Sequence, residues 1–68
     1  MADRTLDALD DALDVANREA SLWFGRMARA DREGDKNLAS SFMKRRDSRT
    51  AVCIGLADLI AAYKEGSS

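Results

Sequence analysis

Few side chains in this chain of 68 residues are suited to catalysis. It contains no histidine, the side chain that general acid–base catalysis uses most often. Carboxylates recur four residues apart at Asp7 and Asp11 and again at Asp10 and Asp14, a spacing that places each pair on one solvated face of a helix. Cys53 stands among aliphatic residues without a neighbouring base, which is typical of a buried small hydrophobe. We therefore expect no enzymatic activity.

Metal and cofactor sites are equally unexpected. One thiol without any imidazole cannot close a tetrahedral zinc shell, and a single cysteine cannot form a disulfide within the chain. The sequence has no glycine-rich phosphate loop. It therefore predicts neither a bound metal nor a cofactor, and a fold of this size must be stabilised by helix packing and oligomerisation.

Side chains suited to binding are better represented. Aromatic and arginine side chains dominate the energetics of protein interfaces. The candidates for contacting a partner are Phe24, Arg26, Arg45, Arg46, Arg49 and Tyr63. Phe24 follows Trp23 and points off the apolar seam of its helix, so it either covers the edge of a dimer or anchors a partner protein. Tyr63 has the same two interpretations.

Two long helices must position these residues. In the first, apolar side chains recur in alternating steps of three and four residues at Leu6, Leu9, Leu13, Ala16, Ala20, Trp23, Met27 and Ala30. This heptad seam favours a small left-handed crossing angle with a neighbouring helix. A second stripe, Ala8, Ala12, Val15 and Leu22, widens the apolar face as in a bundle helix. Asp3 or Thr5 can serve as the N-cap, and we predict the helix over residues 4–32.

A stop and restart signal follows the first helix. Gly34 can take the left-handed conformation that ends a helix, and Asp35 can cap the next one. We predict the second helix over residues 36–65 and a frayed tail over residues 66–68. Because so short a connection makes the helices antiparallel neighbours, residues 1–68 are predicted to form one all-α domain, a two-helix hairpin.

The second helix repeats the heptad spacing at Leu38, Phe42, Arg45, Arg49, Val52, Leu56, Leu59 and Tyr63. Its basic middle has three interpretations: arginine stems along the core, a helix break capped by Asp47 or Ser48, or an exposed basic patch for a ligand. In the antiparallel hairpin Trp23 falls opposite Arg45 and Arg46, which favours a cation–π contact.

Two helices alone leave apolar stripes uncovered, above all in residues 51–63, where the second helix is apolar on more than one face. We therefore expect two hairpins to pair as an antiparallel four-helix bundle. The predicted core of hairpin and dimer is Leu6, Leu9, Leu13, Trp23, Met27, Leu38, Phe42, Val52, Ile54, Leu56, Leu59 and Ile60. Gly55 weakens the helix, which indicates close approach of another helix there.

Charge is distributed unevenly around a net charge of −1. Residues 25–50 carry eight basic and four acidic side chains, a net +4, whereas both ends of the chain are acidic. The longest apolar run, residues 51–57, is much shorter than the roughly 20 residues that cross a bilayer. The first residues do not read as a signal peptide. We expect a cytoplasmic protein without a membrane partner.

Two functions fit these features. The first is a protein-interaction module that docks a rigid helical face on another protein, such as a transcription regulator, and inhibits it. The second is nucleic-acid binding by the basic loop end. This layout resembles the plasmid copy-number regulator Rop, a two-helix hairpin that dimerises antiparallel and holds an RNA loop complex, which implies RNA or DNA as a ligand.

The small helical chain, rich in Ala, Asp and Arg, also resembles the quorum-sensing anti-activators of pseudomonad phages. Those proteins are expected to be helical dimers, and they inhibit LuxR-type transcription activators and can target the pilus assembly ATPase. The resemblance implies a phage protein that inhibits a host protein in the host cytoplasm. Neither resemblance rests on a residue motif, so no functional residues are carried over.

Overall fold

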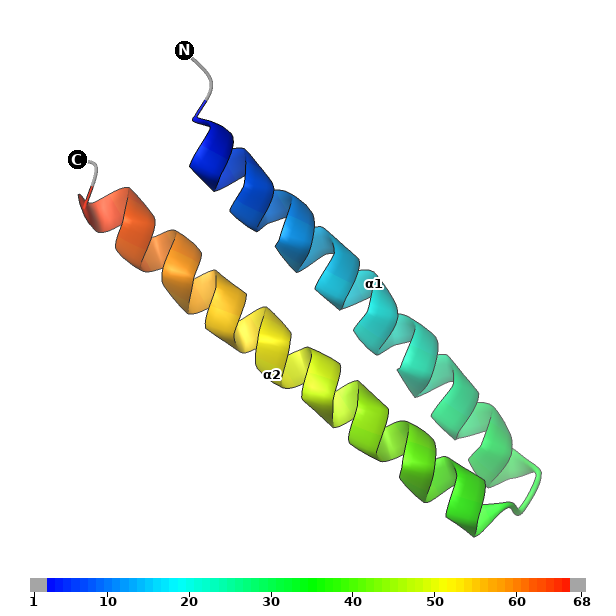
Figure 1. Cartoon of the computed structure of the whole chain (residues 1–68). Coiled ribbons are helices and arrows are strands. Elements are labelled where there is room, and N and C mark those ends of the chain that lie inside the picture. Colours follow the sequence, from blue (N-terminus) through cyan, green and yellow to red (C-terminus); the bar gives the residue numbers. More distant parts are fainter. Residues whose placement is uncertain (1–2, 67–68) are drawn as a thin grey trace.

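The computed structural model describes residues 3–66, which form two antiparallel helices joined by a short turn (Figure 1). Helix α1 spans Arg4–Arg32 and helix α2 spans Lys36–Gly66. The helical hairpin and the bounds of α1 agree with the sequence-based prediction. α2 continues through Gly66, one residue beyond its predicted end, and the predicted fraying of residues 67 and 68 lies outside the described residues.

Asp3 fixes the start of α1. Its Oδ1 accepts hydrogen bonds from the backbone N–H groups of Thr5 at 3.0 Å and Leu6 at 3.2 Å. The carboxylate thereby satisfies two of the donors that the first turn of a helix leaves unpaired. Asp7, also in the first turn, adds a negative charge where the helix dipole favours one.

The turn between the helices is built around Gly34, whose φ is 80°. The N–H of Asp35 donates to the carbonyl oxygen of Ala30 at 3.0 Å, and the N–H of Gly34 donates to that of Asp31 at 3.1 Å. This pair of hydrogen bonds is the Schellman motif, which needs a left-handed residue that glycine supplies without steric cost. Asp35 then caps α2, because its Oδ1 accepts from the N–H of Leu38 at 3.0 Å.

The seam of α1 lies where the heptad pattern predicts it. All eight seam positions are buried or half-buried against α2: Leu6, Leu9, Leu13, Ala16, Ala20, Trp23, Met27 and Ala30. Ala16 and Ala30 are the most buried, with exposed fractions of 4% and 2%. Asp7, Asp10 and Asp14 between the seam positions make one flank of the first turns acidic, so the leucine seam is the side that packs against α2.

The seam of α2 is confirmed at Phe42, Leu56 and Tyr63, but a small rotation of the helix shifts the alternate seam positions by one residue relative to the prediction. Its buried or half-buried positions are Ala39, Phe42, Arg46, Cys53, Leu56, Ile60 and Tyr63. The predicted seam residues Leu38, Arg45, Val52 and Leu59 each precede one of these positions and are exposed, as is Ile54. Residues 51–62 are apolar on nearly every side, so two neighbouring stripes share the same heptad spacing. Leu38, Val52, Ile54 and Leu59 are thus outside the hairpin core, and their place in a dimer core stays a prediction.

α2 runs without a break through its basic middle. The predicted alternative of a new helix capped by Asp47 or Ser48 is therefore wrong. Thr50 Oγ1 donates to the carbonyl oxygen of Arg46 at 2.9 Å, a bond within the continuous helix. The side chain of Arg46 is 31% exposed in the seam, which agrees with the interpretation that arginine stems lie along the core.

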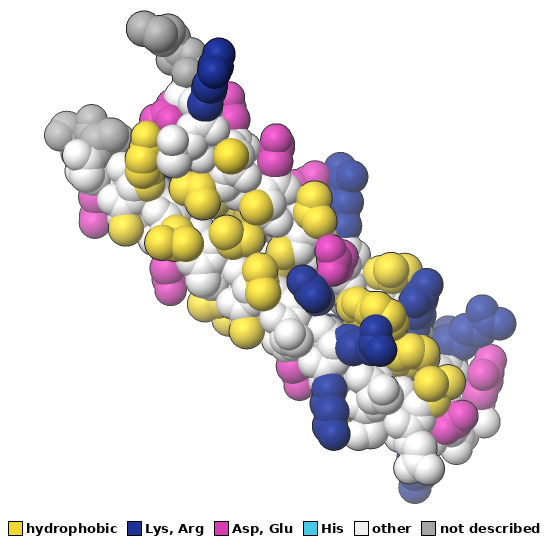
Figure 2. All heavy atoms as spheres, in the orientation of Figure 1, with side chains coloured by type: hydrophobic (Ala, Val, Ile, Leu, Met, Phe, Trp, Pro, Cys, Tyr) yellow, Lys and Arg dark blue, Asp and Glu magenta, His cyan; other side chains and the backbone are white. Residues whose placement is uncertain are grey.

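The hairpin exposes more surface than a compact chain of its mass. Its accessible surface is 5185 Å², whereas a folded monomer of this mass exposes about 4,200 Å². The Cα atoms extend over 51 × 17 × 11 Å. On the face shown in Figure 2, hydrophobic side chains gather over the half nearer the chain ends, and most Lys and Arg side chains lie around a second hydrophobic group in the half nearer the turn. Neither helix, as far as it is described, has an apolar stretch that could cross a membrane.

Candidate protein-interaction surfaces

Two faces of the hairpin flank the seam. Residues seven apart on a packed helix project to the same side, and three grooves show which residues of the two helices border each other. Face A comprises Ala8, Ala12, Val15, Glu19, Leu22, Arg26 and Arg29 of α1 with Leu38, Arg45, Arg49, Val52 and Leu59 of α2. Face B comprises Asp7, Asp10, Asp14, Asn17, Phe24, Ala28 and Asp31 of α1 with Lys36, Met43, Asp47, Thr50 and Ile54 of α2.

The half of face A nearer the chain termini forms an apolar groove of about 490 Å³. Val15 of α1 and Val52 of α2 border it and are 52% and 40% exposed. Toward the turn the groove is bordered by an ion pair between the helices, in which Arg49 Nε lies 3.1 Å from Glu19 Oε2. The two side chains of the pair are 45% and 40% exposed, so the pair contributes at most about 1 kcal/mol to the stability of the hairpin.

An aromatic cluster follows on the same face nearer the turn. The ring centroids of Trp23 and Phe42 are 5.6 Å apart with an interplanar angle of 32°, a tilted arrangement that aromatic pairs favour. The guanidinium carbons of Arg26 and Arg45 each lie 4.9 Å from the Trp23 ring centroid. The predicted cation–π contact between Arg45 and Trp23 is confirmed, and Arg26 adds a second one.

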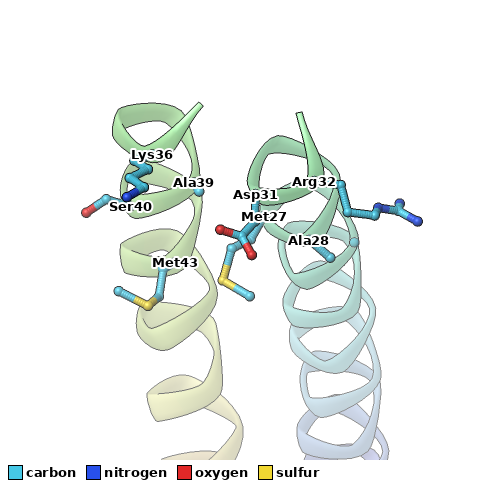
Figure 3. A pocket seen from close by; sticks show the side chains of 9 residues that line it. Met27, Ala28, Asp31, Arg32, Lys36, Ala39, Ser40 and Met43 are labelled. Atoms are coloured by element: carbon cyan, nitrogen blue, oxygen red, sulfur yellow. The ribbon is translucent and has the colours of Figure 1, made fainter. Parts of the chain in front are cut away.

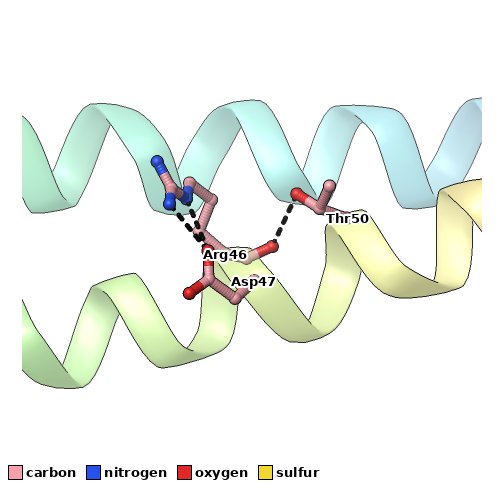
Figure 4. Close-up of polar contacts among 3 residues, drawn as sticks. All are labelled: Arg46, Asp47 and Thr50. Carbon is pink, nitrogen blue, oxygen red and sulfur yellow. Dashed lines mark hydrogen bonds and ion pairs between the residues drawn. The ribbon is translucent and has the colours of Figure 1, made fainter.

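Arg46 does not join this cluster, contrary to the prediction, because the rotation of α2 directs it to face B. Its guanidinium carbon lies 5.8 Å from the ring centroid of Phe24. Asp47 Oδ1 accepts from Arg46 Nε at 3.1 Å and from Nη2 at 2.7 Å. Figure 4 shows the two hydrogen bonds between Arg46 and Asp47 together with the hydrogen bond of Thr50 to the Arg46 backbone. Phe24 itself is 52% exposed, so face B presents an aromatic ring beside an arginine that is already held in place.

A second groove, of about 730 Å³, lies on face B next to the turn. Met27 and Met43 line it, with Asp31 and Lys36 among the charged residues at its border. In Figure 3, Met27 and Asp31 point from α1 toward α2, whereas Arg32 points away from α2. Methionine side chains adapt to irregular partner surfaces, so this groove extends the apolar surface around Phe24.

Tyr63 lies at the opposite end of the hairpin and joins the two helices. Its hydroxyl donates a hydrogen bond to Asp3 Oδ2 at 2.8 Å. This hydrogen bond, with further ones from the backbone N–H groups of Leu6 and Thr5, lowers the pKa of the Asp3 carboxyl. The same bond to Asp3 raises the pKa of the Tyr63 hydroxyl. Tyr63 is therefore engaged within the hairpin rather than presented as a bare aromatic anchor.

Comparisons with models of protein families, with curated proteins and with solved structures found no match to this chain.

The six predicted binding residues do not form one surface. Arg26, Arg45 and Arg49 lie on face A, Phe24 and Arg46 meet on face B, and Tyr63 lies at the far end, as the contacts above show. Within residues 3–66 no three side chains of the types that bind metals lie together as ligands. Faces A and B are therefore helical surfaces on which arginine and aromatic side chains hold each other in place.

Sequence reasoning missed two contributors to these faces. Glu19 is the one acidic side chain in the apolar stripe of α1 on face A, and it pairs with α2. A carboxylate within the apolar run of this stripe, between Val15 and Leu22, indicates an ion pair with the basic middle of the second helix. The methionine groove was less accessible, because Met27 and Met43 come together only through the rotation of α2.

Proposed function

We propose that this chain is a small non-enzymatic protein-interaction module that pairs with a second copy as a four-helix bundle and binds and inhibits another protein. The observation that carries the proposal is the apolar surface that the hairpin leaves uncovered. Large hydrophobic side chains that are at least 40% exposed are Val15, Leu22, Phe24, Leu38, Met43, Val52, Ile54 and Leu59. Exposed apolar surface in this amount is typical of proteins that associate with others.

The cluster of Phe24 and Arg46 supports partner binding on face B. Aromatic and arginine side chains are the residue types that most often contribute large binding energies. Arg46 is held by Asp47 and by the ring of Phe24, so little side-chain freedom remains to be lost when a partner docks. Both residues stand on regular helix, which keeps the surface rigid.

The resemblance to phage anti-activators makes a transcription regulator of the host cytoplasm the first class of partner to test. Such a partner would bring an apolar pocket for Phe24 and an acceptor group for Arg46, because these are the complements of an aromatic ring and a guanidinium. Inhibition follows if the bundle covers the surface that the regulator uses for DNA, for its ligand or for its own dimer.

The experiment uses the purified protein and purified LuxR-type regulators. Phe24→Ala and Arg46→Ala should each weaken binding by about 30-fold or more, measured by titration calorimetry, because truncating a binding hot spot costs about 2 kcal/mol. Asn17→Ala is the matched control, since Asn17 occupies the same side of α1 one heptad earlier. Binding that is as strong with both substitutions as without them would show that the Phe24 surface is not the docking site.

A second candidate function, RNA or DNA binding, is favoured by the charge of the half nearer the turn. Residues 25–50 carry eight basic and four acidic side chains. Ion pairs of Arg29 with Glu33, Arg46 with Asp47 and Arg49 with Glu19 neutralise part of this charge. Nucleic-acid binding would appear as an affinity that falls steeply as salt rises. Absence of binding at low salt excludes this candidate.

A further inference from the structure

We infer that face A is the surface on which a second copy of the chain packs, antiparallel to the first, with the twofold axis beside the Glu19–Arg49 ion pair. Face B, with Phe24 and Arg46, then remains on the outside of the bundle. This inference rests on the homodimer of the proposed function and assigns its contact surface and its register.

The area of the hairpin agrees with one missing partner. The accessible surface of 5185 Å² exceeds that of a compact monomer of this mass by about 900 Å². A standard protein interface buries about 800 Å² on each partner. One copy of similar size, covering one face, therefore accounts for the excess.

The composition of the two faces favours face A. In the half of α1 nearer the chain end, face A carries Ala8, Ala12 and Val15, with Asp11 as the single carboxylate at the border of its groove. The same turns carry Asp7, Asp10 and Asp14 on face B. Packing a copy on face B would take these carboxylates out of water without a matching set of cations, which costs several kcal/mol for each unpaired charge. Packing on face A buries mainly methyl groups, together with the one carboxylate of Asp11.

Charge determines the relative direction of the copies. Parallel copies would place Arg26 and Arg45 against the same arginines of the partner, in the half nearer the turn. Antiparallel copies, aligned so that Val15 lies opposite the partner's Leu22, place Arg26 opposite the partner's Asp11. Asp11 and Arg26 line grooves on face A. The antiparallel alignment thus replaces a repulsive contact with an attractive one.

The two helices give the same alignment independently. On α2, antiparallel copies match Val52 with the partner's Arg45 and Leu59 with the partner's Leu38, which centres the contact between residues 48 and 49. On α1, the match of Val15 with Leu22 centres it between residues 18 and 19. Glu19 and Arg49 pair within one hairpin, so both centres lie at the same height and one twofold axis serves both helices.

The outer edge of face A also permits close approach of the two α2 helices. Small residues recur there every seven positions, at Ser41, Ser48, Gly55 and Ala62. Within the hairpin a Cβ added at Gly55 would meet no atom within 4 Å, so the lack of a side chain at this position is not needed by the hairpin itself. Antiparallel packing about residue 48 sets Gly55 against the partner's Ser41, where small side chains let helices approach closely.

Two exposed aliphatic residues of the same helix provide the test of the face. Val52 lies on face A and Ile54 on face B, with exposed fractions of 40% and 61%. By sedimentation equilibrium, Val52→Glu should raise the dimer dissociation constant by about 100-fold or more, because each copy then buries an unpaired carboxylate. Ile54→Glu, the matched control, should change it by less than about 3-fold. Circular dichroism confirms that both variants remain helical.

The other outcomes are equally decisive. Dissociation by Ile54→Glu but not by Val52→Glu moves the copy to face B and overturns the inference. A wild-type chain that stays monomeric up to millimolar concentration also overturns it, and leaves face A to another partner. Neither result bears on whether Phe24 binds a partner protein, because that binding is measured separately with the Phe24→Ala variant and a purified regulator.

Disulfide trapping tests the register in a Cys53→Ala background. Ser48→Cys should cross-link to its own copy under mild oxidation, because the two residues meet at the axis. Ser41→Cys should not, since its copies are separated by about 21 Å along the helices, far beyond the reach of a disulfide. Combining Ser41→Cys with Gly55→Cys should restore cross-linking. A chain that sediments as a dimer but does not cross-link through Ser48→Cys would refute the antiparallel register.

Discussion

Faces A and B are built by the same two helices and differ in what interrupts their apolar side chains. On face A the terminal half is aliphatic, and the charged pair of Glu19 and Arg49 joins α1 to α2. On face B the terminal half of α1 is acidic, and Phe24 stands exposed beside Arg46. Because unpaired carboxylates resist burial and isolated aromatic rings do not, the two faces are suited to different neighbours even though neither is covered in the hairpin.

The largest predicted effect is a difference in the free energy of unfolding between alanine substitutions at two adjacent aromatic residues. Trp23 packs on Phe42 in the seam and lies between two arginines, whereas Phe24 is 52% exposed. Trp23→Ala should lower the free energy of unfolding by about 2 kcal/mol, because it removes a half-buried ring from the core. Phe24→Ala should cost less than about 1 kcal/mol. Urea denaturation at one fixed protein concentration measures both, and similar losses would show that Phe24 belongs to the core.

The next prediction concerns the dimer dissociation constant and compares two carboxylates that each pair with an arginine. Glu19→Ala should raise the dimer dissociation constant at least about 10-fold, because Arg49 is then left unpaired in the proposed contact between copies. Asp47→Ala removes a partner of Arg46 on face B and should change that constant by less than about 2-fold. Sedimentation equilibrium measures the dimer dissociation constant of both variants. Equal changes would contradict the assignment of the dimer contact to face A alone.

Two glycines give a smaller contrast. A Cβ added at Gly25 or at Gly55 would meet no atom within 4 Å in the hairpin, and replacing an open helical glycine by alanine adds about 1 kcal/mol of stability. Gly25→Ala should show this full gain in thermal unfolding. Gly55→Ala should gain less, because its new methyl group meets the second copy. Identical gains would argue against close packing at Gly55.

The smallest effect should be a pH dependence at the ends of the hairpin. Because the hydrogen bond from Tyr63 lowers the pKa of Asp3 in the folded state, Asp3 contributes stability that is fully present above its unfolded pKa near 3.8. This stability is lost as pH falls through the lower folded pKa. Tyr63 has a raised pKa, so its contribution is present below pH 10 and is lost as pH rises through the folded value.

Tyr63→Phe removes the hydrogen bond that is the largest cause of both pKa shifts. At neutral pH the variant should melt at a slightly lower temperature than the wild type, and the two melting curves should converge at acidic and at strongly alkaline pH. Thr5→Ser, which keeps the helix start polar, is the control and should retain the wild-type pH profile. A constant offset between Tyr63→Phe and wild type from pH 2 to pH 11 would rule out the Asp3 hydrogen bond as the cause.

The turn and α1 were predictable because few alternatives compete there. Gly34 is the only glycine near the middle of the chain, and acidic residues between the leucines restrict α1 to one seam. In α2 the apolar residues surround the axis from Ala51 onward, so the heptad spacing fits two stripes one residue apart. Which of the two stripes faces α1 depends on how the side chains of both helices fit together. The sequence of α2 alone does not contain this information.

The same rotation explains what was missed in the candidate surfaces. The rotation places Arg46 in the seam and leaves Arg45 beside it on face A, so the predicted contact of Trp23 with Arg45 is correct and the one with Arg46 is wrong. The split of the binding candidates between two faces follows from this rotation. Helical spacing thus identifies which residues are available for binding, whereas tertiary packing decides on which side each is presented.

The hairpin is fastened at both extremities, by the Schellman turn around Gly34 and by the hydrogen bond from Tyr63 to Asp3. Between these two fixed ends, the middle of α2 contacts α1 through Arg46 and Arg49 rather than through aliphatic side chains. Guanidinium groups tolerate water that a leucine would exclude. Local opening of a single hairpin should therefore start near Arg46 and Arg49, with amide hydrogens exchanging faster there than in the aliphatic turns toward the chain ends.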